Sequence, residues 1–346
     1  MRDSTSIRSG RSEERITLSS LLGLRFIVGM TSITDRIERE LGIPGLAARL
    51  AEQLDPADLQ SLLLDVYRRL VQRRPRNIVL ADYETNRFVH PSRLAAARYV
   101  EWEALALSLL PAAFEALELS PVCPLGASAA MAGLGQDRVL STIRNTEVVS
   151  DSTNILALEA ASRRRAYRRT DARSTTPVHL AANHRLLRTQ RYSDPCLSAH
   201  FRVYSLCSAG RDRGSFAFEI ESVLLHVEFY TSIIRAFLGH STSISVRLTT
   251  LDTDVALASG IDTLLERLRK DLPAVEVSMH PERTAGRQYY RTLCFWIYAV
   301  NDAGEAVQLV DGGCVDWTQR LLSDVKERLV ISGAGTDRVL AMRSAT

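Results

Sequence analysis

The chain has 346 residues, 46% of them hydrophobic and 24% charged, so it can bury one large core or two ordinary ones. A formal net charge of +3 is too small to indicate a nucleic-acid-binding surface. The five cysteines are scattered and include no C-x-x-C pair, which argues against a disulfide framework or zinc site and favours a cytoplasmic location. No apolar run reaches the roughly 20 residues that span a membrane, so we expect no membrane partner.

The first hundred residues are expected to be helical after a leader. Residues 1–30 are expected to be a disordered leader, because they begin polar and Arg25 interrupts the only signal-like apolar run. Residues 31–100 form a helical segment, in which Ser32 is a candidate N-cap and residues 79–81 are a candidate short strand. Its apolar faces can pack on the main domain or dock a partner, and packing is the commoner use of such a face.

The remaining residues, 101–346, show short strands separated by turn signals and a few helices. The periodicity predicts helices over 91–110, 155–169, 223–238, 260–272 and 317–327. It predicts strands over 139–143, 148–149, 201–207, 216–220, 244–251, 275–280, 293–300 and 306–310. Strands in succession with segregated helices predict an α+β fold, in which helices flank an antiparallel sheet.

Two glycine-rich stretches near the C-terminus are the most informative feature. A predicted strand runs into Gly312-Gly313, and after a spacer Gly333-Ala334-Gly335-Thr336-Asp337-Arg338 opens a predicted helix. Glycine lets a strand and a helix approach closely, and by itself such a turn is explained by packing as well as by ligand binding.

Three earlier stretches carry residues suited to chemistry. Asp151 lies just before a predicted helix, where Ser152 or its neighbours also serve as caps. Arg202 and Arg211 stand nine residues apart in a basic hairpin pattern. The pair Tyr289-Tyr290 precedes a predicted strand, where it is also expected to pack on the sheet.

In this order, these stretches resemble the motifs of the class II aminoacyl-tRNA synthetase core. The match is closest to histidyl-tRNA synthetase and its relative, the regulatory subunit of ATP phosphoribosyltransferase. It covers about residues 101–342 of the sequence. The resemblance implies the class II core fold and a homodimer. We expect no anticodon-binding domain, because the sequence stops shortly after the last motif.

The resemblance also implies a role for each motif residue. The catalytic pair would be two arginines that hold ATP, Arg211 and Arg338, with Gly333 and Gly335 lining the nucleotide site. Mg²⁺ would bridge the phosphates to Glu219 or Glu221 on a return strand. The amino-acid substrate would contact Asp151, Thr153, Tyr289, Tyr290, Gly312 and Gly313.

The sequence departs from the family pattern in two stretches, the one that holds Arg202 and Arg211 and the one that ends in Tyr289-Tyr290. Gly210 and Arg213 replace a phenylalanine and a glutamate, and Ala285 stands where the family has a catalytic arginine. Two functions therefore remain open. The first is ATP-dependent amino-acid activation outside standard translation, with a carrier protein, a tRNA or a small amine as acceptor. The alternative is a catalytically silent paralogue that senses an amino acid as a regulatory or scaffold subunit.

Overall fold

The computed structural model describes residues 32–190 and 198–343, and the leader expected over residues 1–30 lies outside them. The chain divides into two compact units, Met1–Leu63 and Leu64–Thr346, with the division inside a helix. None of the helices in the described ranges is long and apolar enough to cross a membrane.

The first unit contains helices α1 (Ile33–Leu41), α2 (Leu46–Glu52) and the start of α3 (Pro56–Gln72). Ser32 begins α1 in a capping box with Asp35, as its sequence context predicted, and satisfies two free backbone amides at the helix start. The carboxylate of Glu38 accepts hydrogen bonds from the amides of Gly45 (2.7 Å) and Ala47 (3.1 Å), which joins α1 to the start of α2.

The second unit begins within α3 and continues with helices α4 (Arg76–Thr85) and α5 (Ala96–Leu109). The strand predicted over residues 79–81 is wrong, because these residues lie inside α4. The β-branched pair Ile78-Val79 favours a strand locally, but Pro75 at the N-cap is compatible with a helix start and the helix continues through the pair.

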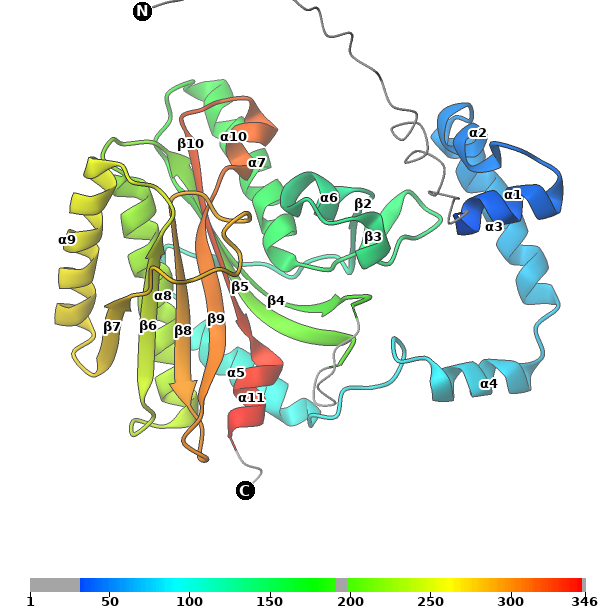
Figure 1. Cartoon of the computed structure of the whole chain (residues 1–346). Coiled ribbons are helices and arrows are strands. Elements are labelled where there is room, and N and C mark those ends of the chain that lie inside the picture. The colour runs from blue at the N-terminus through cyan, green and yellow to red at the C-terminus, as the bar shows by residue number, and fades with distance from the viewer. Residues whose placement is uncertain (1–31, 191–197, 344–346) are drawn as a thin grey trace, which may run out of the picture. The chain divides into compact units, whose positions relative to one another are not determined.

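The second unit is built on an eight-stranded sheet with the order β1-β4-β5-β10-β9-β8-β6-β7 (Figure 1). The six central strands pair antiparallel, and the edge strands β1 and β7 pair parallel with their neighbours, so the predicted α+β fold with an antiparallel sheet is confirmed. In chain order the strands are β1 (Glu115–Ala116), β4 (Val178–Leu187), β5 (His200–Arg211), β6 (Ile244–Thr250), β7 (Val275–Met279), β8 (Leu293–Val300), β9 (Ala306–Val315) and β10 (Glu327–Gly335).

Helices cover the two faces of this sheet unequally. Helices α5, α8 (Ala217–Leu238) and α9 (Val255–Asp271) form the larger apolar core with one face. Helices α7 (Ser152–Thr170) and α10 (Trp317–Leu322) pack on the other face, against β4, β5 and β10 (Figure 1). A separate pair, β2 (Val122–Pro124) and β3 (Thr146–Val148), lies beside the short α6 (Ala127–Ala132), and α11 (Thr336–Met342) ends the described fold.

Several predicted elements differ from the structure. Residues 216–220 are the start of α8 and not a strand, because a helix that is buried on most sides carries an apolar pattern like that of a strand. Residues 139–143 make only an isolated bridge, from Ser141 to Glu147. Strands β4 and β10 were missed: β4 contains two alanines, two histidines, an asparagine and an arginine, and the start of β10 was assigned to the preceding helix.

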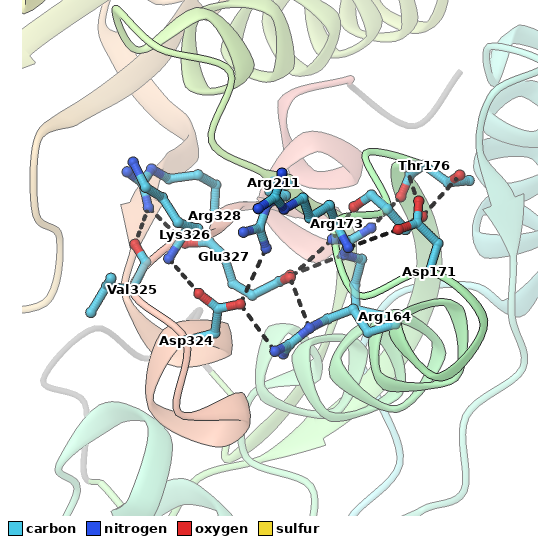
Figure 2. Close-up of polar contacts among 12 residues, drawn as sticks. Arg164, Asp171, Arg173, Thr176, Arg211, Asp324, Val325, Lys326, Glu327 and Arg328 are labelled. Atoms are coloured by element: carbon cyan, nitrogen blue, oxygen red, sulfur yellow. Dashed lines mark hydrogen bonds and ion pairs between the residues drawn. The ribbon is translucent and has the colours of Figure 1, made fainter.

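A buried ion pair fastens α7 to the start of β10. Arg164 and Glu327 are both fully buried, and the guanidinium contacts the two carboxylate oxygens at 2.9 Å each. Arg164 also donates to the carbonyls of Thr176 (2.6 Å) and Ser174 (2.8 Å) in the segment before β4 (Figure 2). One side chain therefore joins a helix, the end of a strand and the loop that leads to another strand.

A row of polar side chains runs through the core between α8 and the sheet. His226 is fully buried, and its imidazole lies between the hydroxyls of Ser208 on β5 (2.9 Å) and Ser332 on β10 (2.7 Å). Ser208 also contacts Nδ1 of His179 on β4, at 2.7 Å. Burial lowers the pKa of His226 to about 3, so this imidazole is neutral at pH 7.

We expect Glu327→Ala to lower the free energy of unfolding by roughly 3–5 kcal/mol, because it leaves the buried Arg164 guanidinium without its counterion. The matched control is Glu101→Ala, which breaks the exposed Arg343–Glu101 pair and should cost less than about 1 kcal/mol. Urea denaturation followed by circular dichroism measures both. Equal losses in the two variants would contradict the role assigned to the buried pair.

We expect the free energy of unfolding to fall as the pH drops below 6.5, because His226 takes up a proton readily only in the unfolded chain. The neutral imidazole stabilises the fold fully above pH 6.5, and that contribution is lost toward pH 3 at about 1.4 kcal/mol per pH unit. In His226→Gln this slope should be shallower by that amount. Parallel stability curves for the two proteins between pH 4 and pH 7 would exclude the assignment.

Candidate functional site

A cavity of about 1710 Å³ opens on the sheet face that carries α7, and all of its lining residues belong to the second unit. It extends along β9 and β10 from the N-terminus of α7 to the start of α11. Sites for one small molecule usually measure about 300–1,000 Å³, so this cavity has room for two ligands side by side.

Most of the residues predicted for the site line this cavity. They are Asp151, Thr153, Tyr289, Tyr290, Gly333, Gly335 and Arg338. Gly312 and Gly313 follow the lining residue Asp311 on β9 and permit close packing. A Cβ on Gly313 would lie 2.7 Å from Cδ1 of Tyr290, and one on Gly312 would lie 2.5 Å from Cβ of Ser332 on the opposite face.

At one end of the cavity, a carboxylate and a guanidinium face each other. Asp151 is the N-cap of α7, and its Oδ1 accepts from the amide (3.0 Å) and the hydroxyl (2.7 Å) of Thr153. Its Oδ2 lies 3.6 Å from Nη2 of Arg188, whose Nε donates to the carbonyl of Ser150 at 2.9 Å. One negative and one positive group at this spacing match the ammonium and carboxylate of a free amino acid.

The tyrosine pair forms the wall next to Asp151. The rings of Tyr289 and Tyr290 stand nearly perpendicular with centroids 5.0 Å apart, and Tyr289 also meets the Trp317 ring at 5.3 Å. Burial raises the pKa of both phenols well above the usual value, and the nearby carboxylates of Asp151 and Asp311 add to it. Both phenol groups are therefore neutral at physiological pH, and they line the cavity as hydrogen-bonding groups.

The other end of the cavity carries arginines at the start of α11. Asp337 holds this end together, because its carboxylate accepts from the hydroxyl of Tyr99 (2.7 Å) and the amide of Arg202 (2.8 Å). Arg202 pairs with Glu103 at 3.1 Å. Arg338 is exposed, and its Nη1 donates to the carbonyl of Gln308 at 3.3 Å. Both arginines line the cavity, and the exposed guanidinium of Arg338 is the one that an anionic ligand can reach directly, since that of Arg202 is paired with Glu103.

Arg211 does not belong to this cavity. Arg202 and Arg211 lie nine residues apart on β5, which corresponds to about 30 Å along an extended strand. Arg211 instead pairs with Asp324 at 3.2 Å, beside the buried Glu327 (Figure 2). The structure therefore does not bring Arg211 and Arg338 together, because Arg211 lies at the end of β5 that pairs with Glu327 and Arg338 follows the other end of β10.

Glu219 and Glu221 also lie away from the cavity, on the first turns of α8. Glu219 is buried, and its Oε1 contacts Nε of Arg328 at 2.8 Å, while burial raises the pKa of its carboxyl group. Glu221 pairs with Arg213. Among the described residues, no cluster of three or more histidine, cysteine, aspartate or glutamate side chains could hold a metal ion. The structure does not bring these two glutamates to the cavity, and their predicted metal role stays a prediction.

Two site residues were missed by the sequence analysis. Arg188 follows β4 directly, and β4 itself was not predicted. Asp311 was given no role, although a charged residue next to Gly312-Gly313 in a buried strand is a usable signal of a site.

No protein-family model and no curated protein matches the sequence. Solved structures do match. Histidyl-tRNA synthetase of S. aureus superposes with a TM-score of 0.52 at 13% identity, over 71% of this chain and 66% of that one. An ATP phosphoribosyltransferase regulatory subunit/histidyl-tRNA synthetase of Bacillus halodurans gives 0.55 at 12%, over 74% and 83%.

Histidyl-tRNA synthetase of Nostoc sp. PCC 7120 gives a TM-score of 0.51 at 14% identity, over 73% of this chain and 74% of that one. The chain therefore spans about two thirds to four fifths of the length of these three proteins. Identities this low show the fold alone. The described chain has the fold of the class II aminoacyl-tRNA synthetase core, as the order of its motifs predicted.

Proposed function

We propose that this cavity binds an amino acid and ATP together and converts the amino acid to an aminoacyl adenylate. One observation carries the proposal: the Asp151–Arg188 pair and the arginines Arg202 and Arg338 lie at opposite ends of one cavity with room for two ligands. The fold found in the comparisons supports this reading and the regulatory alternative equally.

The amino acid would lie at the α7 end. Its ammonium group would contact Asp151, and its carboxylate would face Arg188, with the neutral ring of Tyr289 beside both. Such a charge-assisted pair selects a free amino acid over an amine or an acid alone. Because Asp151 is already fixed as the N-cap of α7, it needs little reorganisation to bind.

ATP would occupy the α11 end, with its phosphates toward Arg202 and Arg338. The residues fit a polyanion, because guanidinium groups bind phosphate oxygens bidentately. A carboxylate oxygen of the amino acid would then attack the α-phosphorus and pyrophosphate would leave, helped by positioning and charge neutralisation. Mg²⁺ would arrive bound to the phosphates, and we assign it no protein ligand.

The alternative, a catalytically silent sensor or scaffold subunit, is favoured by the stretch that leads to Tyr289-Tyr290, because it lacks the family's arginine. Ala285 stands where the family has its arginine, and the nearby Arg283 does not replace it. Arg283 is 1% exposed and pairs with Asp311 at 2.9 Å, so its guanidinium is already committed. A sensor would bind the amino acid at Asp151 and Arg188 without activating it.

The acceptor of an adenylate would be a carrier protein, a tRNA or a small amine. A cytoplasmic location is consistent with four buried, unpaired cysteines among the described residues. We also propose a homodimer through α5, the helix that resembles the dimer motif of the family. Its apolar residues Val100 and Leu107 are 67% and 50% exposed, which leaves an apolar surface for a second copy.

We expect one amino acid to stimulate ATP–pyrophosphate exchange by the purified protein. Arg338→Ala should reduce the rate roughly 100- to 1,000-fold, because it removes one positive charge from the transferring phosphate. Asp151→Asn, which keeps the helix cap, should raise the KM for that amino acid and leave the KM for ATP unchanged.

The matched control is Arg211→Ala, assayed at a temperature where the variant stays folded. The structure places Arg211 outside the cavity, so exchange should persist. Loss of exchange in Arg211→Ala would instead support the prediction from the sequence that Arg211 and Arg338 together hold ATP. Absence of exchange with all twenty amino acids, together with amino-acid binding, would favour the sensor.

We expect the chain, whose mass is 38.4 kDa, to sediment as a dimer. Placing two like charges in the interface with Val100→Glu and Leu107→Glu should yield a monomer, because the desolvated carboxylates would lack partners. Sedimentation velocity measures both proteins, and a wild-type monomer at micromolar concentration would refute the dimer.

A further inference from the structure

We propose that Asp311 selects the side chain of the bound amino acid and requires one that ends in an N–H or O–H donor. The inference rests on the amino-acid binding proposed above and goes beyond it by naming the class of substrate. It derives from the position of one carboxylate on an otherwise bare part of the cavity floor.

The floor around Asp311 is formed by residues without side chains. Asp311 on β9 pairs in register with Gly333 on β10, and Gly313 is the next residue of β9 on the same face. Gly333 and Gly286 line the cavity with Asp311. A Cβ on Gly333 would lie 2.9 Å from Cγ1 of Val203, so this position is restricted to glycine. Val203 and the Tyr290 ring approach the backbone at these glycines, and the Asp311 carboxylate lines the cavity between them.

Arg283 fixes this carboxylate from behind. Its Nη2 donates to Oδ1 of Asp311 at 2.9 Å, and its Nε donates to the carbonyl of Ala285 at 2.8 Å. The guanidinium also stacks on Trp296, 4.1 Å from the ring centroid. Arg283 is 1% exposed and lies outside the cavity lining, so it positions Asp311 and does not contact the ligand.

The Asp311 carboxylate keeps acceptor positions for a ligand beside its contacts with Arg283, Trp296 and Tyr290. The Asp311 side chain is 41% exposed toward the cavity, and an ionised carboxylate can only accept hydrogen bonds. Arg283 neutralises most of its charge, so a full positive charge on the ligand is not required. An apolar side chain would leave the acceptor positions that face the cavity without a partner, and a site built around a polar contact rejects such analogues strongly.

The two tyrosines define the path of the side chain. Tyr289 lies against Asp151, and Tyr290 lies against Asp311, with 5.0 Å between their ring centroids. A ligand whose ammonium group binds Asp151 therefore passes both rings before it reaches Asp311. The site favours a side chain long enough to cross this distance, with its donor at the far end.

The test is equilibrium binding of all twenty amino acids, measured by calorimetry with wild-type protein, Asp311→Asn and Asp311→Leu. The wild type should prefer an amino acid with a terminal donor. Asp311→Asn should weaken its binding roughly 10- to 100-fold, because a charged hydrogen-bond acceptor is lost. Asp311→Leu should shift the preference to an apolar amino acid. The control Glu282→Gln alters an exposed carboxylate of the same loop and should change neither preference nor affinity.

Asp311→Leu leaves Arg283 buried without its partner, so the double variant Arg283→Met/Asp311→Leu provides a second, foldable probe. A wild-type preference for an apolar amino acid, or unchanged selectivity in Asp311→Asn, would overturn the inference. Selective binding without pyrophosphate exchange would refute activation and leave Asp311 as the selector. Exchange driven by an apolar amino acid would support activation and refute selection by Asp311. If no amino acid binds, both activation and selection are refuted.

Discussion

The open face of this sheet depends on glycines where β9 and β10 run side by side. The Cβ positions of Gly313 and Gly333 are already occupied by atoms of Leu293, Tyr290 and Val203, so any other residue would displace a wall of the cavity. The opposite face of the same strands is covered by α8. On the other face, α7 and α10 cover β10 over part of its length and the cavity takes the rest, which lets a rigid sheet serve as a binding floor.

The residues that stabilise the fold and the residues that line the cavity lie at opposite ends of β10. At its first residue, Glu327, β10 is held by a buried guanidinium, and at its last residue, Gly335, it opens into the helix that carries Arg338. The charged network around Asp324 and Arg211 lies at the first end and the cavity at the other. Arginines of similar sequence context therefore serve different purposes at the two ends.

The sequence predicted the elements whose signals are local and failed where the signal depends on partners. The cap at Ser32 and the helix start just before Arg338 were assigned correctly, because both have local signals, whereas Gly333 and Gly335 lie in β10 and not in a turn. Arg211 was misplaced because a nine-residue spacing describes a hairpin or one long strand equally well. Arg188 was missed because β4 has weak strand propensity and is stabilised by pairing with β5.

The buried imidazole of His226 orients the hydrogen bonds around it. A neutral imidazole carries one N–H, so one of its two serine neighbours must donate a proton while the other accepts one. The hydroxyl of Ser208 is shared with His179, so the orientation of the hydrogens on β4, β5 and β10 is set together. The three strands are therefore joined by a chain of hydrogen bonds, in which the tautomer of His226 decides which of the two serines donates and which accepts.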